Sequence, residues 1–276
     1  MKVGIIDLDP IIHIVANVQY SSGNRDNEEK VKRQVRSFIL QVQASAKCTH
    51  YVMFYQGSGF KNFRKDILPE YKAHRTPSDG ILLWKAAILD ELNNFGGATR
   101  LFFIESDDAL SLYAEMCRNK EIEYVVITGD KDSIQIPGTQ YNPYKAGTME
   151  EDRWKYVTFG YANQFLHCQY LAGDSDDIST DFAGIRGVGI RTAQRYLNKF
   201  PMQKWQEAIT QFYVDKLGDD ARTRFLNTYK MVKLLDESII AKYGDDVEKE
   251  CKSVISLDPK SYINQTTQLF DDLFNT

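Results

Sequence analysis

Four short apolar runs in the first half of the chain have the length and composition of buried β-strands: Val3–Ile6, Tyr51–Phe54, Leu101–Ile104 and Tyr124–Thr128. Between the first two runs, apolar residues recur at helical spacing, namely Val31, Val35, Phe38, Ile39 and Val42. Further helices are predicted at Leu82–Phe95 and Ala109–Asn119. Strands that alternate with helices are typical of an α/β fold, in which helices cover both faces of a mostly parallel sheet.

The second half of the chain has a different pattern. A turn is predicted at Tyr141–Gly147, followed by a strand at Trp154–Phe159. After Gly160 the pattern is largely helical up to about Tyr243. Without internal repeats or a low-complexity linker, we expect one compact unit with three parts: a core over residues 1–164, a helical subdomain over residues 165–260 and a tail over residues 261–276.

Composition adds mainly exclusions. With 43% hydrophobic and 26% charged residues, the 276-residue chain has the composition of an ordinary globular protein. No apolar run approaches the roughly 20 residues needed to span a bilayer, and the strand pattern begins too early for a signal peptide. Four scattered cysteines favour unpaired thiols in a reducing compartment: Cys48, Cys117, Cys168 and Cys251. We therefore expect a cytoplasmic protein.

The net charge of −4 hides two basic segments. Between Ile185 and Lys204 there are five cations and no acid, and between Lys61 and Arg75 there are five cations and two acids. Clustered cations, rather than the total charge, set the local affinity for phosphate. Charge runs are usually solvated helix faces, so either segment alone would indicate little.

Acidic residues follow three of the predicted strands: Asp7 after the first, Glu105, Asp107 and Asp108 after the third, and Asp130 and Asp132 after the fourth. In parallel sheets the carboxyl ends of the strands meet at one edge, which is where sites form. Asp174 and Asp177 would face the same side of a helix and could complete the set. Any one acid could be a helix cap, but eight at one edge require compensation by protons, cations or basic partners.

The candidate ligand set contains only oxygen. Without a His or Cys among these acids, the set suits Mg²⁺ or Mn²⁺ and disfavours zinc. Two such ions are the common device for phosphodiester hydrolysis, because together they activate water and stabilise the charge on the scissile phosphate and the departing oxygen.

Six motifs occur in a fixed order: Ile5-Ile6-Asp7, Phe63-Arg64 with Pro69–Arg75, Glu105–Asp108, Thr128–Asp132, Leu171–Asp177 and Gly187–Ala193. Together they resemble the 5′-3′ exonuclease and flap endonuclease family, which includes the 5′-nuclease domain of bacterial DNA polymerase I and stand-alone bacteriophage 5′-exonucleases. The resemblance covers about residues 1–200. It implies a PIN-like nuclease core, a helical arch at about 56–85 and a helix–hairpin–helix at about 170–200.

The resemblance also implies a ligand set for two Mg²⁺ ions, with Mn²⁺ as a substitute. The first site would comprise Asp7, Glu105, Asp107 and Asp130, with Asp108 beside it. The second would comprise Asp132, Asp174 and Asp177 and would share Asp107 and Asp130. For Asp9, an outer-sphere ligand and a turn-stabilising role are equally open, and Asp176 is expected to face solvent.

Contacts with DNA follow from the same resemblance. Lys72 and Arg75, on one helical face, would grip the scissile phosphate as catalytic residues. Residues of the arch (Lys61, Arg64 and Tyr71) would bind the single strand, with aromatics beside phosphate contacts. Residues of the hairpin (Gly187, Gly189, Arg191 and Thr192) would bind the duplex backbone irrespective of its sequence, beside a K⁺ ion.

Two features depart from the family pattern. The stretch Phe54-Tyr55-Gln56-Gly57 lacks the usual Asp after the second strand, so we expect a looser first metal site or a differently held hydration shell. Residues 178–186 form a longer connection to the hairpin than usual, which puts the hairpin geometry and its K⁺ ion in question.

Alternative functions stay open. In a haloacid-dehalogenase-type phosphatase, Asp7 would be the nucleophile and Asp9 the acid/base, but the Phe63–Arg75 stretch and the hairpin would have no role. A non-catalytic protein that binds branched DNA would need the basic segments without the acids. Residues 268–276 are either a docked final helix or an acidic–aromatic tail that binds a sliding clamp or a single-strand-binding protein.

We expect hydrolysis at the 5′ side of DNA or RNA–DNA duplexes with a 5′ end, nick or flap, leaving 3′-hydroxyl ends on the released mono- or oligonucleotides. The task would be primer removal, as by an RNase H, flap trimming or genome degradation in replication or repair. For a bacteriophage protein, the location would be the host cytoplasm. The approximately 75 residues after the hairpin leave no room for a polymerase domain.

Overall fold

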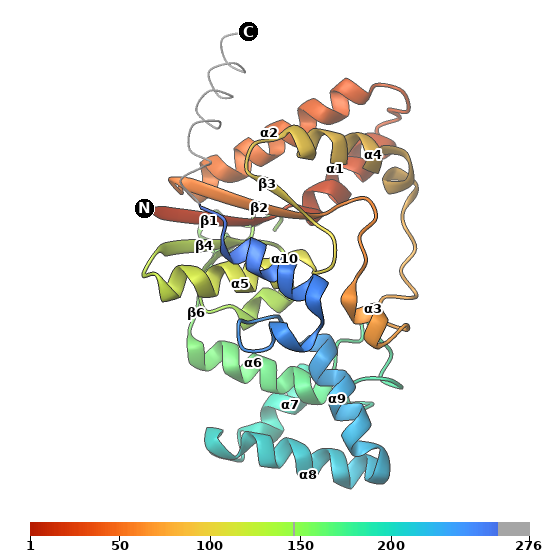
Figure 1. Cartoon of the computed structure of the whole chain (residues 1–276), viewed down its shortest axis with the longest axis vertical. Helices are drawn as coiled ribbons and strands as arrows, with labels where there is room; N and C mark the ends of the chain where they lie inside the picture. Colours follow the sequence, from red (N-terminus) through yellow and green to blue (C-terminus); the bar gives the residue numbers. More distant parts are fainter. Residues whose placement is uncertain (146, 259–276) are drawn as a thin grey trace.

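A six-stranded sheet lies at the centre of the computed structural model, which describes residues 1–145 and 147–258 (Figure 1). Its strand order is β3-β2-β1-β4-β5-β6. The first five strands are parallel, and β6 pairs antiparallel with β5. The strands are β1 (Lys2–Asp7), β2 (His50–Gln56), β3 (Ala98–Leu101), β4 (Glu123–Ile127), β5 (Gly138–Tyr141) and β6 (Trp154–Val157). The predicted mostly parallel sheet is confirmed.

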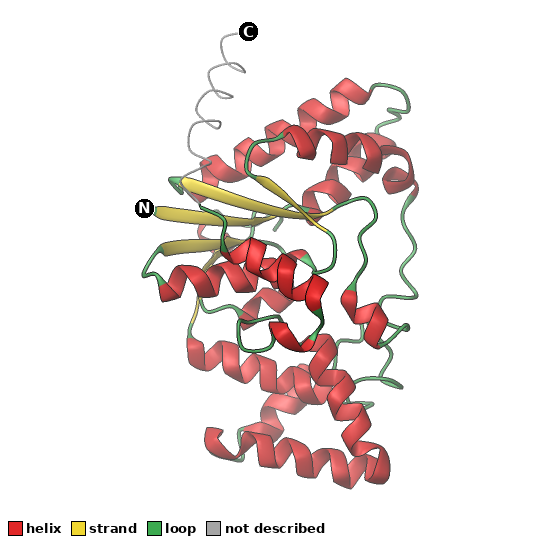
Figure 2. Cartoon of the chain, viewed as in Figure 1, coloured by secondary structure: helices red, strands yellow, loops and turns green. Residues whose placement is uncertain are grey.

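Helices cover both faces of the sheet, as Figure 2 shows in red and yellow. On one face lie α1 (Asp9–Ser21), α2 (Glu28–Ala46) and α4 (Asp79–Asn94). On the other lie α5 (Ser106–Asn119) and α10 (Asp245–Ile255). Strands that are buried on both faces need apolar side chains throughout, which explains their uninterrupted apolar runs.

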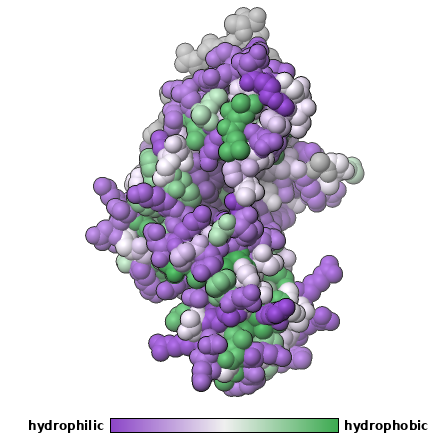
Figure 3. Space-filling model, turned by 90° about the vertical axis from the view of Figure 1, so that its right-hand side faces the viewer, coloured by the Kyte–Doolittle hydropathy of each residue, from purple (hydrophilic) through white to green (hydrophobic). Residues whose placement is uncertain are grey.

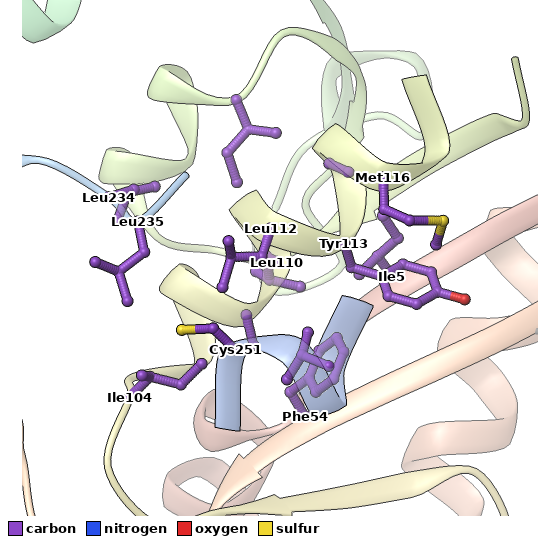
Figure 4. Close-up of a cluster of buried hydrophobic side chains, with 14 of the residues drawn as sticks. Ile5, Phe54, Ile104, Leu110, Leu112, Tyr113, Met116, Leu234, Leu235 and Cys251 are labelled. Carbon is purple, nitrogen blue, oxygen red and sulfur yellow. The ribbon is translucent and has the colours of Figure 1, made fainter. Parts of the chain in front are cut away.

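Each face of the sheet has its own apolar core. Ile6, Met53 and Ile127 point to the face of α1, α2 and α4. Figure 4 shows the opposite cluster, in which Ile5 and Phe54 from the strands lie with Tyr113 of α5 and Cys251 of α10. The register pairs Asp7 with Phe54 and Ile6 with Ile127, so β1, β2 and β4 end close to one another.

A helical part lies beside the sheet, in the lower half of Figure 1. It comprises α6 (Phe159–Ala172), α7 (Ile190–Leu197), α8 (Trp205–Leu217) and α9 (Ala221–Val232). Its helices share a separate core around Tyr170, Leu197, Trp205 and Tyr213. Short 3₁₀ turns occur at Lys131–Gln135, Glu151–Arg153, Met202–Lys204, Gly218–Asp220 and Ile240–Lys242.

Three elements differ from the sequence predictions. The third strand ends at Leu101, and residues 102–104 form a bend in which Phe102 is 43% exposed. Strand β5 was not predicted, because Gly138–Tyr141 contains no apolar run. Helix α1 was also not predicted. Pro10 lies in its first turn, where a backbone N–H has no partner within the helix, so proline is tolerated there.

The segment between β2 and α4 contains only a short helix, α3 (Phe63–Ile67), followed by turns through residue 74. Lys72 has a φ of 53°, which an α-helix does not allow. The expectation that Lys72 and Arg75 share a helical face is therefore wrong, although both side chains pair with Asp177.

The surface in Figure 3 is largely hydrophilic, with small separate hydrophobic patches. Among the described residues, no helix is long and apolar enough to cross a membrane. The four cysteines are all free thiols. Cytoplasmic location stays a prediction, as does clamp binding by residues 268–276, which lie outside the described residues.

Candidate active site

A cleft of about 550 Å³ lies at the edge of the sheet where β1, β2 and β4 end. Its acids are Asp7, Asp9, Glu105, Asp107 and Asp130, of which all but Asp9 were predicted to bind metal directly. Its basic side chains are Lys65, Lys72, Arg75, Lys85 and His13. Opposite charges therefore line a single cleft, as expected for a site that binds both cations and phosphate.

Asp7 and Asp130 come from neighbouring strands. The hydroxyl of Thr128, which follows β4, donates to Asp7 Oδ2 (3.1 Å), and the Asp9 N–H donates to Asp7 Oδ1 (3.0 Å). Burial, with the nearby Asp9 and Asp130, raises the pKa of Asp7 well above its ordinary value. Asp130 accepts a hydrogen bond from the Asp132 N–H (2.7 Å) and is exposed to the cleft.

The first turn of α5 carries the most compact acidic group. Carboxylate oxygens of Glu105, Asp107 and Asp108 lie within 4.8 Å of one another. Burial and the charges of Glu105 and Asp108 raise the pKa of Asp107 well above its usual value. Burial also opposes the ionisation of Glu105, but Lys72 and Arg64 overcome it and lower the pKa of Glu105.

Asp108 and Arg64 form a buried ion pair. Arg64 is 1% exposed, and its Nη1 and Nη2 donate to Asp108 Oδ2 (2.5 Å) and Oδ1 (2.8 Å). The Leu235 N–H also donates to Asp108 Oδ1 (3.0 Å). These donors occupy both carboxylate oxygens of Asp108, although Asp108 belongs to the compact group whose oxygens could hold a metal ion. Its place beside the first metal site stays a prediction. Arg64 is not placed where DNA could contact it.

Tyr71 also lies in the interior, at 3% exposure. Its hydroxyl lies 2.8 Å from Glu105 Oε2 and 3.0 Å from Asp177 Oδ2, so it bridges two acids from distant parts of the chain. The prediction that Tyr71 stacks on a DNA base is therefore corrected. Phe63 belongs to the apolar core as well, whereas Phe60 lines the cleft.

Lys72 and Arg75 face the acids directly. The Lys72 ammonium pairs with Glu105 and lies 3.3 Å from Asp177 Oδ2, and Arg75 pairs with Asp177 Oδ1. Burial disfavours the charge on Lys72, but Glu105 and Asp177 overcome this and raise its pKa, so Lys72 stays charged. Lys61 is an exposed side chain of the same segment.

The other predicted ligands lie between the sheet and the helical part. Asp132 Oδ1 accepts from Gln169 Nε2 (2.7 Å), and Asp174 Oδ1 accepts from Lys131 Nζ (3.0 Å). Burial, together with Asp174 and Asp130, raises the pKa of Asp132 to about 8. Asp174 and Asp177 flank a single turn rather than lying on a helix, and the Ile178 N–H bonds to the Asp174 carbonyl.

These three acids (Asp132, Asp174 and Asp177) do not join the compact group at α5; in residues 1–145 and 147–258, that group contains only Glu105, Asp107 and Asp108. Asp176 is exposed, as expected, and pairs with Lys131. The structure thus gathers Asp7, Glu105, Asp107 and Asp130 in one cleft, and Asp177 of the second set pairs with Lys72 and Arg75, which line that cleft.

Asp9 has protein partners for both carboxylate oxygens. The Gln56 N–H donates to Oδ1 (3.0 Å) and the Ser106 hydroxyl to Oδ2 (2.6 Å). Asp9 thereby ties the end of β2 to the start of α5. This arrangement is consistent with the turn-stabilising role, and the outer-sphere alternative stays a prediction.

Two basic side chains of the cleft, His13 and Lys85, were not predicted from the sequence, and Lys65 was recognised only as one cation of the basic segment Lys61–Arg75. His13 lies one helical turn after Asp9 in α1, a spacing that puts both on the same face and could have identified it. Burial lowers the pKa of His13, which keeps its ring neutral at neutral pH.

The hairpin residues lie at the start of α7. Gly187 has a φ of 80°, and Gly189 precedes the first helical residue, Ile190. Arg191 and Thr192 are exposed in the first turn of this helix. A second cavity, of about 440 Å³, adjoins Asp174, Gly187 and Gly189. The hairpin thus lines the same cavity as Asp174, one of the second set of acids.

The donor chemistry of the cleft fits hard divalent cations. Among the described residues, Asp7, Asp107 and Asp130 have no ion pair with a lysine or arginine. Burial and neighbouring acids raise the pKa of Asp7 and Asp107, which means that their charges are inadequately compensated by the protein. Oxygen ligands that need a counter-charge suit Mg²⁺ or Mn²⁺.

Known proteins share both the sequence pattern and the fold. The chain is 28% identical to the thermostable DNA polymerase I of Thermus thermophilus over 50% of its length and 17% of the polymerase. It is 26% identical to flap endonuclease Xni of Shewanella frigidimarina, covering 63% of this chain and 66% of that protein. T5 5′-exonuclease with bound zinc superposes with a TM-score of 0.62 at 16% identity, covering 92% and 98% of the two chains, which shows a shared fold.

The family model described as "5′-3′ exonuclease, N-terminal resolvase-like domain" matches residues 14–159. This range is more than half of the chain and contains β2 to β6 with the acids at the ends of β3 and β4. The matched relatives extend beyond the aligned regions, which are 17% and 66% of their lengths. The chain belongs to the 5′-3′ exonuclease family.

Proposed function

We propose that this chain is a magnesium-dependent, structure-specific 5′-nuclease acting on DNA or RNA–DNA duplexes with a 5′ end, nick or flap. The observation that carries the proposal is the meeting of Asp7, Asp107 and Asp130 with Lys72 and Arg75 in one cleft. A phosphodiester bond needs both counter-charges for its phosphate and an activated water, and this cleft has residues for both tasks.

Asp7, Asp107 and Asp130, which pair with no lysine or arginine of the described residues, would hold the metal ions together with Glu105. Asp132, Asp174 and Asp177 would serve the second position. When bound, Mg²⁺ supplies charge stabilisation and lowers the pKa of water. In the hydrolysis, a water oxygen bonds to phosphorus and the bond from phosphorus to the 3′ oxygen breaks. That oxygen takes up a proton, so one product ends in a 3′-hydroxyl and the other in a 5′-phosphate.

The cationic side chains would position the scissile phosphate. Lys72 is held near Glu105 and Asp177, and its charge is retained because these acids raise its pKa. Arg75 reaches Asp177 from the same turn and lines the same cleft. Their ammonium and guanidinium groups would bind non-bridging phosphate oxygens as negative charge develops there.

The duplex would bind at the hairpin, through backbone amides near Gly187 and Gly189 and the side chains of Arg191 and Thr192. Such contacts do not depend on base sequence. We further propose a K⁺ ion at this hairpin, where it would neutralise duplex phosphate; duplex affinity should then be higher in KCl than in equimolar LiCl. Equal affinities would contradict this part of the proposal.

Labelled flap, nicked, blunt and RNA–DNA substrates with excess Mg²⁺ test the function directly. Cleavage should stop in EDTA, and Asp130→Ala should abolish it without unfolding the protein. Binding in Ca²⁺ without any cleavage in Mg²⁺ would instead favour a non-catalytic branched-DNA binder. An aspartyl-phosphate formed from a phosphomonoester would favour the phosphatase alternative.

Replacing Lys72 gives a sharper test of its assigned role. Because the lysine would act mainly in the transition state, Lys72→Ala should lower kcat on the order of 100-fold while changing duplex affinity little. Lys61→Ala is a matched control from the same basic segment, with an exposed side chain. An equal loss of kcat in both variants would contradict a specific role for Lys72.

A further inference from the structure

Glu250 of α10 accepts three hydrogen bonds from consecutive backbone amides. The Phe102 N–H donates to Oε1 (2.7 Å), and the N–H groups of Phe103 and Ile104 donate to Oε2 (2.8 and 2.9 Å). These three residues form the bend between β3 and α5, which ends immediately before Glu105. A carboxylate from the far end of the chain thus holds the bend that leads into the acidic turn.

The other side of this bend contacts the basic segment. Carbonyl oxygens of Leu101, Phe102 and Phe103 accept hydrogen bonds from the N–H groups of Gly57 (3.2 Å), Lys61 (2.6 Å) and Phe63 (3.1 Å). The bend is therefore bonded on one side to Glu250 and on the other to the segment that leads to Lys72. A shift of the bend would displace both the acids and the cations of the cleft.

Glu250 itself is anchored by the core. Its neighbours Val247, Cys251 and Val254 are buried against α5, and Figure 4 shows Cys251 in one cluster with Ile104 and Leu110. Groups on packed elements hold a site more accurately than groups on free loops. The contact therefore connects two well-packed helices, α10 and α5, across an otherwise irregular bend.

We propose that Glu250 is a positioning residue for the metal-binding acids, acting through the bend at residues 102–104 on Glu105 and Asp107. The inference rests on the proposed function, since it assumes that these acids bind divalent metal. It assigns to α10, which lies outside the matched family region, a role in preparing the cleft. Glu250 is not among the residues that line the cleft.

Mn²⁺ binding to the full chain without DNA tests this role, with free Mn²⁺ measured by electron paramagnetic resonance. Glu250→Ala should weaken Mn²⁺ affinity by about tenfold, as loss of groups that orient metal ligands does. Glu250→Gln should weaken it less, because its amide oxygen still accepts one or two of the bonds. Glu248→Gln is the matched control, because Glu248 lies on the same helix and pairs with Lys252 at the surface.

The outcomes separate the two proposals. If the wild-type chain binds no Mn²⁺ and cleaves nothing, the proposed function fails. If the wild-type chain binds and cleaves but Glu250→Ala retains full Mn²⁺ affinity, only the role of Glu250 is overturned. A merely structural role would lower the unfolding temperature without changing the Mn²⁺ affinity of the folded protein.

Hydrogen exchange in the wild-type chain covers the case in which Glu250→Ala does not fold. Binding of Mg²⁺ at Glu105 and Asp107 should slow exchange of the three amides at residues 102–104, because the bend and the acids are coupled. Amides at the carboxyl end of α10 should exchange at unchanged rates. Unchanged exchange of residues 102–104 at saturating Mg²⁺ would overturn the inference.

Discussion

Arg64 illustrates how a single residue can have a role different from that of its neighbours in sequence. It lies in a segment with five cations, yet it is buried and holds Asp108 and Glu105. Its partners lie 41 and 44 residues away, so the pairing could not be predicted from local pattern. The burial of Tyr71 was missed for the same reason, because its partners Glu105 and Asp177 lie 34 and 106 residues away in sequence.

Removing Arg64 should therefore reduce stability rather than DNA affinity alone. Arg64→Ala leaves the fully buried Asp108 without its cation, which should cost about 3–5 kcal/mol of unfolding free energy. Urea denaturation measures this loss. The exposed Lys65, one residue along, supplies the control, and Lys65→Ala should change the unfolding free energy by less than about 0.5 kcal/mol. Similar small losses in both variants would contradict the buried pair.

Asp132 gives a pH dependence with a defined sign. Its pKa is about 8 in the folded metal-free chain, above the ordinary value of 3.8, so the folded state binds the proton more tightly than the unfolded state. Stability in EDTA should therefore fall as pH rises from about 4 to about 8. Melting temperatures across this window should fall less steeply for Asp132→Asn. Parallel curves for the two proteins would contradict the raised pKa.

At the scale of elements, continuous apolar runs predicted the buried strands well. β1, β2 and β4 lie within a residue or two of their predicted positions, because each is buried on both faces. The run at Leu101–Ile104 was misassigned as strand, since its apolar residues pack from a bend whose amides bond to Glu250. Strand β5 lies between β4 and β6, but its four residues, Gly-Thr-Gln-Tyr, include no apolar run, so it gave no strand signal.

Gly184 allows the long connection between Asp177 and the hairpin to pass close to the end of α6. It has a φ of 75°, and a Cβ there would lie 2.6 Å from the Ala172 carbonyl oxygen at the end of α6. Its N–H donates to the Thr228 hydroxyl of α9 (2.7 Å). Only glycine combines this positive φ with so close an approach of the connection to α6.

Gly184→Ala should consequently be more harmful than Gly187→Ala. Both glycines have a positive φ, which costs roughly 1–3 kcal/mol for alanine. At Gly187 a Cβ meets no atom within 4 Å, whereas at Gly184 it collides with backbone. The two variants, compared by urea denaturation, should differ by more than about 1 kcal/mol, with Gly184→Ala the less stable. Equal stabilities would argue against this close approach.

At the scale of the whole molecule, net charge is a poor guide to DNA affinity. The chain carries −4 overall, but acids line the cleft while Arg191 and its neighbours occupy the exposed start of α7. The pattern of cations and acids was visible in the sequence, and topology explains why the acids meet at one edge. The sequence did not reveal which individual cations face solvent.

Duplex binding should weaken steeply with salt, since it would depend on phosphate contacts. Arg191→Ala should reduce the slope of log affinity against log salt by about 1, equally for unrelated base sequences. Fluorescence anisotropy in Ca²⁺ measures this slope. Lys252→Ala, which removes a surface cation of α10 on the sheet side of the molecule, should leave the slope unchanged. A slope unaffected by Arg191→Ala would exclude this arginine from the interface.

The register of β1 determines which sequence changes this strand can tolerate. Side chains of a strand alternate between faces, and Asp7 ends β1 directly opposite Phe54. Inserting or deleting one residue between Lys2 and Asp7 would turn every following side chain to the other face and present an aliphatic group where Asp7 now lies. Exchanges among Val, Ile and Leu at these positions keep the alternation. The strand should thus accept many substitutions but no indel.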